Sequence, residues 1–585
     1  MSEGLELRWP GKYVDGQRAP LVDHGAELRE RERLGPDAAS TDNQLICGDN
    51  LLALEALVRD APESVDLVYI DPPFATGNRF ALSRRIGDKK AGTEAELRLP
   101  AFDDAWTGGI AGFLAMLDPR LRLIHRLLKP TGSLYVHVDP TVGHAVKLML
   151  DELFGPACFQ REIIWRIGWI SGFKTRARNW IRNHDTIFFY TKHPREFVFN
   201  KMWVPHPKGY ERREGRAAKA PGVAIDDVWN AGTSELELSG RESLDSIQIK
   251  SFSREKTGWA TQKNESLLRR IIAASSEAGA VVADVFAGSG TTAKVAAELG
   301  RRFVVCDHAD AAVQICRQRL LAAGASLQVL ELDARERVHA LERLAAELGQ
   351  AGRESSVAET LETWLLEQLG AEPEATIEAP FAGRRGEVGL AIALPGQPVD
   401  DARRESLCQA ARAQGLASVE LVAFDWDALP EAEHAQRSSA APEIELVELA
   451  VGRSIFDAAT RARPWVEGGV AIHERARLVL DSRPHAEADA LELTVVDLAF
   501  ARPEHAPEAV QGSASKPRTF ADRLLGWAVY DADAPTEPLF VTARSSAREP
   551  LELRARVARR EQFLIACEDI CGHRHCWRWS PLSSA

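Results

Sequence analysis

The stretch Val65-Asp66-Leu67-Val68-Tyr69-Ile70-Asp71-Pro72-Pro73-Phe74 decides the fold of this chain. Its apolar run has almost no alternation and is rich in β-branched and aromatic residues, which is typical of a buried parallel strand. The two prolines cannot continue a central strand, so the strand ends at Asp71. Ligands of open α/β sheets bind at the carboxyl ends of the strands. We therefore expect the carboxylate of Asp71 and the ring of Phe74 to lie at the rim of a ligand pocket.

Length and composition bound the class of protein. With 585 residues the chain is too long for a single core, so several domains are expected. The sequence shows neither an apolar run long enough to cross a bilayer nor a signal-like start. Its eight cysteines are thinly spread, which favours a reduced compartment over a disulfide framework. We therefore expect a cytoplasmic protein without a membrane partner.

The net charge of −13 hides an uneven distribution. Residues 321–585 carry 43 acidic and 28 basic groups, a balance of −15, which leaves +2 for residues 1–320. Residues 160–220 alone carry 14 basic and 5 acidic groups. Because phosphates respond to the local potential, the acidic total does not exclude a nucleic-acid partner.

The first half of the chain alternates strand and helix patterns. A short strand over 44–50 ends in Gly48-Asp49, a helix follows over 51–58, and the strand ending at Asp71 comes next. This β-α-β unit predicts parallel strands with a right-handed crossover. Residues 75–108 read as a long polar loop, which favours a lid or a substrate-contacting element. A helix over 113–128, a strand over 133–139 and a helix over 141–154 continue the pattern.

The segment 162–199 changes character. Two aromatic-rich strands, 162–169 and 185–191, flank a basic cluster interleaved with tryptophan and phenylalanine. Such a surface suits phosphates and stacked bases, although a β-hairpin with solvated charges explains it equally well. The candidate DNA-binding residues are Lys174, Arg176, Arg178 and Arg182. Residues 200–256 have weak periodicity and read as a small irregular insert.

A second site-forming segment lies at 257–307. The strand 281–286 runs directly into Gly288-Ser289-Gly290, a helix follows over 293–299, and the next strand, 302–306, ends at Asp307. Glycines at such a turn let the backbone approach a ligand, and the helix start favours an anion. An acid at the end of the second strand commonly binds the ribose hydroxyls of a nucleoside. No Gly-Lys-Thr follows, so this is not a phosphate loop.

The acidic carboxyl-terminal region shows no catalytic constellation. A helical stretch over 334–369 precedes strand patterns at 389–394, 419–424, 444–451, 491–500, 524–530 and 561–570, with a helix over 407–413. A terminal cluster of cysteines and histidines fits the usual two-pair spacing of zinc sites poorly, so we expect no metal. It comprises Cys567, Cys571, His573, His575 and Cys576.

The Asp-Pro-Pro-Phe strand end at 71–74 and the Phe-Ala-Gly-Ser-Gly-Thr-Thr turn at 286–292 together resemble the β-class amino-methyltransferases of DNA, in which the catalytic half precedes the cofactor half. The segments 45–54 and 71–78 and the opening Trp9-Pro10-Gly11-Lys12 look more narrowly like the modification (Mod) subunits of type III restriction-modification systems. Residues 261–268 do so too, although Asn264 replaces the usual proline. The resemblance covers about residues 5–335.

This resemblance implies an α/β fold. The expected core is a Rossmann-like, seven-stranded S-adenosylmethionine-dependent methyltransferase sheet in circularly permuted order, followed by an α+β or β-rich accessory region. The expected divisions are an amino-terminal extension (1–42), the catalytic half (43–164), closing strands and target-recognition insert (165–256), the cofactor half (257–335), a helical acidic linker (336–385) and accessory domains (386–585).

The implied activity is transfer of a methyl group from S-adenosylmethionine to N6 of adenine in duplex DNA by base flipping, in a restriction-modification or phage-defence system. The implied catalytic residues are Asp71, Pro72, Pro73 and Phe74. Those implied for the cofactor are Asp49, Lys263, Asp284, Phe286, Ala287, Gly288, Gly290, Thr291 and Asp307. A homodimer and a restriction or defence partner stay open. Alternatives are a cytosine-N4 enzyme, a non-catalytic DNA-binding subunit of a defence complex, and methylation of RNA or protein.

Overall fold

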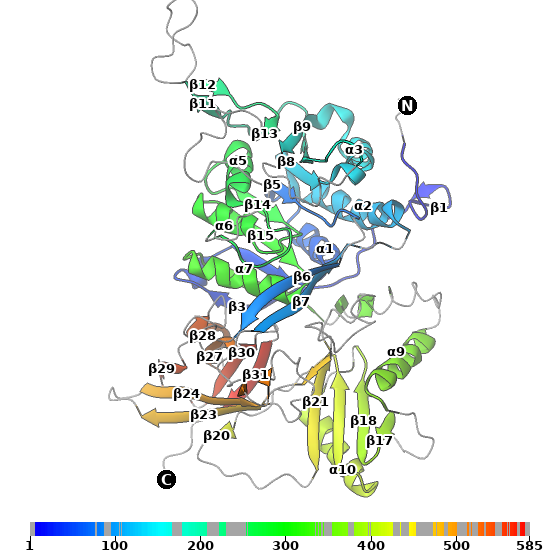
Figure 1. The fold of residues 1–585 in the computed structure, drawn as a ribbon, viewed down its shortest axis with the longest axis vertical. Helices are drawn as coiled ribbons and strands as arrows, with labels where there is room; N and C mark the ends of the chain where they lie inside the picture. Colours follow the sequence, from blue (N-terminus) through cyan, green and yellow to red (C-terminus); the bar gives the residue numbers. More distant parts are fainter. Residues whose placement is uncertain are drawn as a thin grey trace, which may run out of the picture.

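A computed structural model of the chain describes its residues in the following ranges: 6–75, 79–86, 95–104, 106, 108–166, 178–206, 222–229, 253, 255–333, 335–336, 338–340, 343, 354–371, 380–395, 397, 399–424, 433–434, 444–451, 472–474, 477–484, 490–499, 512–513, 516–517, 524–531, 534–543, 553–558, 560, 562–569 and 574–579. Within these ranges the amino-terminal part forms one ten-stranded sheet and three two-stranded sheets (Figure 1). The carboxyl-terminal part forms one five-stranded sheet, two four-stranded sheets and one two-stranded sheet.

The large sheet has ten strands in the order β13-β9-β10-β8-β5-β14-β15-β4-β16-β3. Its central strands, from β8 to β16, are parallel, whereas β10, β9 and β3 introduce antiparallel pairs at the two sides. The strands span β3 Leu28–Leu34, β4 Gln44–Cys47, β5 Val65–Ile70, β8 Leu128–Val138, β9 Phe159–Arg166, β10 His184–Thr191, β13 Val228–Trp229, β14 Val281–Asp284, β15 Arg302–Asp307 and β16 Leu327–Leu332.

The two halves of the sequence meet at the pair β5–β14. Leu67 lies opposite Val282 and Val68 opposite Ala283 in a parallel register. Strands β4 and β5 are parallel members of this sheet, as predicted, but β14 and β15 from the second half lie between them. The carboxyl ends of β5 and β14 therefore lie side by side, although more than two hundred residues separate them in the chain.

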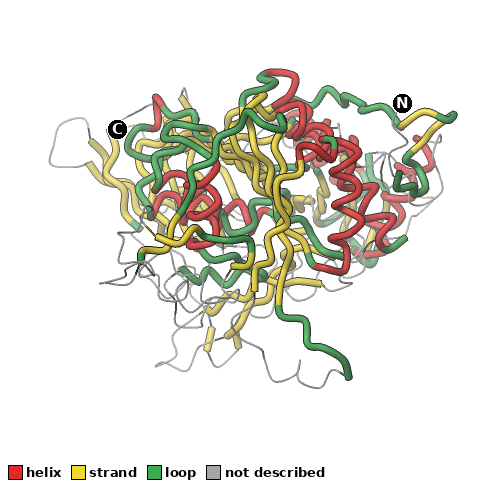
Figure 2. The backbone as a smooth tube through the Cα atoms, turned by 90° about the horizontal axis from the view of Figure 1, so that it is seen from above, coloured by secondary structure: helices red, strands yellow, loops and turns green. Residues whose placement is uncertain are grey.

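Helices cover both faces of this sheet (Figure 2). Helices α1 (Asn50–Asp60), α2 (Ile110–Leu127) and α3 (Pro140–Phe154) pack with one hydrophobic cluster, and α5 (Glu265–Ser275), α6 (Thr291–Glu298) and α7 (Asp310–Ala322) pack with another. Strand β5 contributes Val68 and Ile70 to the first cluster and Leu67 and Tyr69 to the second. Burial on both faces is the reason that this strand shows no alternation in the sequence.

Local sequence signals explain where the helices begin. The carboxylate of Asp49 accepts a hydrogen bond from the Leu51 amide at the start of α1. At α3, Asp139 caps the amide of Thr141, and Pro140 occupies the first turn, where its missing N–H is not needed. Asp139 directly follows β8, and Asp49 follows β4 after Gly48, so both caps place carboxylates at the carboxyl edge of the sheet.

Two expectations are corrected here. The sheet has ten strands rather than seven, because β3, β13 and β16 extend it at its edges. Strand β3 belongs to the expected amino-terminal extension, and its charged sequence Leu-Arg-Glu-Arg-Glu-Arg-Leu gave no apolar strand pattern. The expected loop 75–108 contains an antiparallel hairpin of β6 (Arg79–Ile86) and β7 (Ala95–Asp103), which lies beside α7.

The carboxyl-terminal region begins with a layered α/β unit. Its sheet has the order β17-β18-β19-β21-β22, with β18, β19 and β21 parallel. Helices α9 and α10 pack with separate hydrophobic clusters on this sheet. The elements span α9 Glu354–Gln368, β17 Gly383–Arg385, β18 Val388–Ala393, α10 Asp401–Ala413, β19 Ser418–Ala423, β21 Glu445–Val451 and β22 Ile472–Glu474.

A β-sandwich follows. The sheets β20-β23-β24-β29 and β28-β27-β30-β31 share one core, in which Trp527, Trp577 and Trp579 are buried. Its strands span β20 Glu433–His434, β23 Arg477–Pro484, β24 Ala490–Ala499, β27 Leu524–Asp531, β28 Ala534–Ala543, β29 Arg554–Ala558, β30 Phe563–Asp569 and β31 Arg574–Trp579. Strand β28 lies against β3 of the large sheet. Among the described helices, none is long and apolar enough to cross a membrane.

Candidate active site

A cavity of about 710 Å³ opens at the carboxyl ends of β5 and β14. This volume lies within the range of small-molecule and cofactor pockets. Its walls combine aromatic rings with both acidic and basic groups. The lining includes Asp49, Tyr69, Asp71, Pro72, Pro73, Phe74, Trp106, Arg120, Trp259, Lys263, Asp284, Phe286, Ala287, Gly288, Thr291, Asp307, His308, Glu336 and Arg343.

All four predicted catalytic residues line this cavity. The Oδ2 atom of Asp71 accepts from the ammonium group of Lys263, whereas its Oδ1 atom is buried and has no hydrogen-bond partner. Two polar groups lie near the ring of Phe74: Lys263 Nζ is 5.4 Å from its centroid, and the His137 ring is 6.2 Å away. Asp71 therefore keeps one acceptor atom for a ligand, directly beside an aromatic face.

The turn after Phe74 is held in an uncommon backbone conformation. Ala75 has a φ of 56°, and its amide donates to Asp104 Oδ1 at 2.6 Å. A positive φ is strained for alanine, so this hydrogen bond supports the path of the chain behind the ring. Asp104 was not singled out in the sequence, because it follows a hairpin that read as a loop.

The strand-to-helix turn at 284–291 is fixed by its own carboxylates. Asp284 accepts from the Phe286 amide at 3.0 Å and from the Thr292 hydroxyl at 2.5 Å. Asp307, from β15, accepts from the Gly288 amide at 2.8 Å. Burial, followed by the charges of Asp71 and Asp307, raises the pKa of Asp284 to about 7 despite its two hydrogen bonds.

The two glycines of this turn serve close packing. Gly288 and Gly290 have φ values of 49° and 73°, and a Cβ atom would lie 2.8 Å from Trp259 Nε1 and 2.4 Å from Cys316 Sγ, respectively. Gly288 lines the cavity, whereas Gly290 lies beneath it at the start of α6. Of the nine predicted cofactor residues, Gly290 alone is absent from the lining.

Asp49 lies in the lining but already has partners. Its carboxylate accepts from Arg120 at 3.0 Å, from Arg343 at 2.8 Å and from the Leu51 amide. Burial alone would raise the pKa of Asp49, but the charges of Arg120 and Arg343 outweigh it and hold the pKa below its usual value. Arg343 comes from the stretch after β16, so a residue beyond the predicted cofactor half completes this wall.

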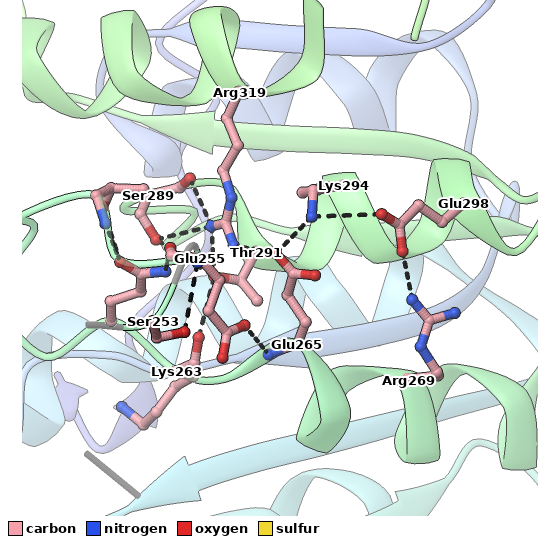
Figure 3. Close-up of polar contacts among 12 residues, drawn as sticks. Ser253, Glu255, Lys263, Glu265, Arg269, Ser289, Thr291, Lys294, Glu298 and Arg319 are labelled. Atoms are coloured by element: carbon pink, nitrogen blue, oxygen red, sulfur yellow. Dashed lines mark hydrogen bonds and ion pairs between the residues drawn. The ribbon is translucent and has the colours of Figure 1, made fainter. Parts of the chain in front are cut away.

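The backbone of Lys263 is anchored through Thr291 and Arg319 (Figure 3). Its carbonyl accepts from Thr291 Oγ1 at 3.2 Å, and Arg319 Nη1 donates to the same hydroxyl at 2.9 Å. Arg319 Nη2 also binds Glu265 at 2.7 Å. In Figure 3 the Lys263 ammonium points away from this network, so the backbone is fixed and the side chain extends into the cavity.

A second polar cluster lies behind Phe74. His137 is fully buried, with Nδ1 2.9 Å from the Tyr69 hydroxyl and Nε2 3.5 Å from Asp185. Burial would raise the pKa of Asp185, but the hydrogen bond and charge of His137, together with the charges of Lys263 and Arg182, lower it to about 2. The ring of Phe74 therefore lies beside a histidine that is hydrogen-bonded to Tyr69 and lies close to the Asp185 carboxylate.

The four predicted DNA-binding residues differ in whether the structure describes them and in how exposed they are. Lys174 and Arg176 lie outside the described residues. Arg178 is exposed, and its neighbour Trp180 has 98% of its surface exposed. Arg182 is half-exposed and pairs with the buried carboxylates of Asp139 and, at 2.5 Å, Asp185. Arg182 is therefore already paired with carboxylates of the protein, whereas Arg178 is exposed at the surface, where a DNA phosphate could reach it.

Sequence reasoning missed Arg120, Arg343, Trp259 and His137. Arg120 carried a usable signal, because it is a buried cation on the apolar face of an amphipathic helix. The other three depend on long-range contacts. For the terminal cysteine-histidine cluster, Cys571 and His573 lie outside the described residues, and the described part of the chain contains no group of three metal-binding side chains.

Comparison with known proteins agrees with this geometry. Residues 65–318 match the family model described as DNA methylase. The type II methyltransferase M.EcaI of Enterobacter cloacae is 26% identical over 385 residues, which cover 55% of this chain and 79% of that protein. The DNA adenine methyltransferase YhdJ of Escherichia coli is 27% identical over 283 residues, covering 47% of this chain and 80% of that protein.

The similarity to one type III protein covers a shorter segment at higher identity. The StyLTI Mod subunit of Salmonella typhimurium is 33% identical over 136 residues, which cover 22% of this chain and 21% of that subunit. The matched family model spans both the Asp-Pro-Pro-Phe strand end and the glycine turn, the two segments that tertiary structure brings together at the cavity. Residues 65–318 of this chain therefore belong to the DNA methylase family.

Proposed function

We propose that this chain transfers a methyl group from S-adenosylmethionine to the N6 amino group of adenine in duplex DNA. The observation that carries the proposal is the unpartnered, buried Oδ1 atom of Asp71, a residue that lines the cavity together with Phe74. A buried carboxylate oxygen without a donor is unfavourable in a folded protein. An N–H donor from a ligand would satisfy it.

The lining of the cavity fits the proposed cofactor. S-adenosylmethionine is a nucleoside that carries a sulfonium cation and an amino-acid group. Asp284 and Asp307 offer negative charge near the turn, and the ammonium of Lys263 offers a partner for a carboxylate. Aromatic rings at Phe286 and Trp259 offer faces for a base. When bound, the cofactor supplies an activated methyl group.

The residues of the chain then have to prepare the acceptor nitrogen. An exocyclic amino nitrogen is a poor nucleophile, because its lone pair is delocalised into the ring. Asp71 Oδ1 and the carbonyl oxygen of Pro72 would each accept one of its N–H groups and favour a tetrahedral nitrogen. The ring of Phe74 would stack on the base, which has to leave the duplex to reach the cavity. Positioning of this kind supplies much of the rate enhancement.

Adenine is preferred over cytosine as the target. An acid at the first position of the Asp-Pro-Pro-Phe segment favours adenine, and the relative YhdJ is named a DNA adenine methyltransferase. Similarity to a type III Mod subunit supports a place in a restriction-modification system, with duplex DNA as substrate and a restriction subunit as partner.

The first test is base analysis of DNA from cells that express the chain. We expect N6-methyladenine in a fixed sequence context, located by long-read methylation profiling. N4-methylcytosine in its place would sink the adenine assignment, and unmodified DNA would count against the activity itself.

A second prediction concerns Asp71. The Asp71→Ala variant should lose methyl transfer to DNA, because the amino group would lose its acceptor, while cofactor binding measured by calorimetry survives. Phe74→Leu is the companion variant, because it keeps apolar bulk but removes the stacking face. Turnover of Asp71→Ala at the level of the unmodified chain would refute the catalytic role.

A further inference from the structure

The ammonium group of Lys263 holds one oxygen of the Asp71 carboxylate and lies over the ring that would stack on the target base. It donates to Asp71 Oδ2 and lies 5.4 Å from the centroid of the Phe74 ring. The lysine is 8% exposed, so this contact lies inside the protein rather than in solvent. A cation over an aromatic face beside a carboxylate occupies the same surroundings as an amino group of a stacked base.

We propose that Lys263 is a cofactor-dependent switch, which holds Asp71 and Phe74 in the free enzyme and exchanges Asp71 for the carboxylate of bound S-adenosylmethionine. The catalytic pair would then open to a base only after the cofactor has bound. This inference rests on the proposed function, since it names a regulation of the same site.

The contacts around Lys263 fix its backbone and leave its ammonium group able to change partner. Its carbonyl is anchored by Thr291, and through that hydroxyl by Arg319, so the backbone position does not depend on Asp71 (Figure 3). The four-carbon stem of lysine carries a point charge that can move between partners. Besides Asp71 and the Phe74 ring, the ammonium also contacts the Thr261 carbonyl, which is 3.5 Å away.

If the Lys263 ammonium leaves Asp71, it must pair with another anion. A buried ammonium that loses its carboxylate without another anion is strongly unfavourable. A cofactor carboxylate offers such an anion, whereas the incoming base offers none. The binding of the cofactor and the release of Asp71 are therefore coupled, and the coupling is reciprocal: anything that frees Lys263 from Asp71 should tighten cofactor binding.

The simpler alternative is a permanent Lys263–Asp71 pair, in which Oδ1 alone serves the base. The two explanations predict opposite signs for one measurement. If the pair is permanent, removing the negative charge of Asp71 weakens binding of the cationic cofactor or leaves it unchanged. If Lys263 switches, the same change tightens binding, because Asp71 no longer competes for the ammonium.

The experiment is isothermal calorimetry on the full chain without DNA, using S-adenosylmethionine and S-adenosylhomocysteine. The second ligand keeps the carboxylate and lacks the sulfonium charge, so it isolates the competition for Lys263. We expect Asp71→Asn to bind S-adenosylhomocysteine about fivefold or more tightly than the unmodified chain does. Lys263→Met should weaken binding, and Asp71→Asn in that background should no longer tighten it.

Two controls separate the switch from general effects. Asp66→Asn removes a carboxylate from the same strand that pairs with Lys129, outside the cavity lining, and should leave the affinity unchanged. The ligand 5′-methylthioadenosine has no carboxylate, so its affinity should not respond to Asp71→Asn. Circular dichroism checks that each variant is folded, and Asp71→Ser replaces Asp71→Asn if the latter is not.

Weaker or unchanged binding of S-adenosylhomocysteine to the folded Asp71 variant overturns the switch. Equal tightening in the presence and absence of Lys263 does so as well. Neither result touches the proposed methyl transfer, which the DNA base analysis decides. Failure of the unmodified chain to bind either cofactor form would overturn both proposals.

Discussion

At the residue scale, each carboxylate around the cavity is fixed by a different kind of partner. Asp49 is held by two arginines, Asp307 by backbone amides, Asp284 by an amide and a hydroxyl, and Asp71 by one lysine. Only Asp71 among these four has an oxygen atom that is buried and without a partner. The same residue type therefore supports three scaffolding roles and one position that is open to a ligand.

Asp284 gives a pH prediction. Its pKa is raised from 3.8 to about 7 by burial, so the folded chain holds a proton that the unfolded chain has released. The stability from this proton is complete below about pH 4 and is lost as the pH rises to about 7. Three pKa units correspond to about 4 kcal/mol as an order of magnitude.

The variant Asp284→Asn should remove this dependence, since asparagine keeps the shape without the charge. The difference in free energy of unfolding, Asp284→Asn minus the unmodified chain, should become more positive from pH 5 to pH 8. Urea denaturation at each pH measures it. Cofactor affinity at pH 8 should fall, because an anion near the sulfonium is lost. Parallel pH profiles for the two proteins would contradict the assignment.

At the element scale, the turn between β14 and α6 depends on a glycine that packs under a neighbouring helix. The Cβ atom of Gly290→Ala would lie 2.4 Å from Cys316 Sγ and 3.1 Å from its Cα atom, on α7. The two helices would have to separate, which would displace the turn that lines the cavity. This is a packing requirement of the fold rather than a ligand contact.

Gly290→Ala should therefore destabilise the chain by several kcal/mol and weaken cofactor binding. Gly324→Ala is a matched control, because Gly324 has a φ of 74° but no atom within 4 Å of its Cβ position. The control reports the backbone strain alone, about 1–2 kcal/mol. If thermal denaturation gives equal losses for both variants, the clash with Cys316 is not the cause.

The segment before β10 contains two arginines that should behave differently. Arg182 pairs with the buried Asp139 and Asp185, whereas Arg178 is exposed. Arg182→Ala should cost about 1–3 kcal/mol of stability, because each of these buried carboxylates loses its charged donor. Arg178→Ala should leave the stability unchanged.

DNA binding provides the second readout for this pair. If Arg178 contacts a phosphate, Arg178→Ala should reduce the slope of log affinity against log salt concentration by about one. Fluorescence anisotropy on a duplex at several salt concentrations measures it. An unchanged slope would remove Arg178 from the DNA interface.

At the scale of the whole molecule, the β-sandwich is tied to the edge of the large sheet. Glu32 on β3 is fully buried, pairs with Arg317 on α7 at 2.9 Å, and accepts from the hydroxyl of Tyr530 on β27. Figure 1 shows β27 and β28 next to β3. A buried acid on an edge strand thus joins the methylase domain to the carboxyl-terminal region.

Tyr530→Phe should lower the free energy of unfolding by about 1.5–3 kcal/mol, the usual range for a hydrogen bond to a charged group. Tyr13→Phe is the control, because its hydroxyl donates to Glu6 in an exposed position. That change should stay within about 0.5 kcal/mol. Urea denaturation compares the two, and an equal small effect would mean that Tyr530 does not secure the junction.

Part of the fold could be predicted from short-range signals. The apolar run before Asp71, the prolines after it and the glycines at 288 and 290 mark strand ends and turns wherever they occur, because they act on their own backbone. The edge strand β3 and the hairpin at 79–103 were missed for the opposite reason. These segments form strands because they pair with other strands, and the local sequence does not show which strands those are.

The sequence by itself determined that two strands end in candidate ligand-binding groups, Asp71 and the turn at 286–292. Only the tertiary structure decided that β5 pairs with β14, that Lys263 reaches Asp71, and that Arg343 closes the wall beside Asp49. Strand pairing and side-chain contacts over such separations are set by the packing free energy of the whole domain. No local pattern encodes that quantity, so the cavity exists only at the level of the folded chain.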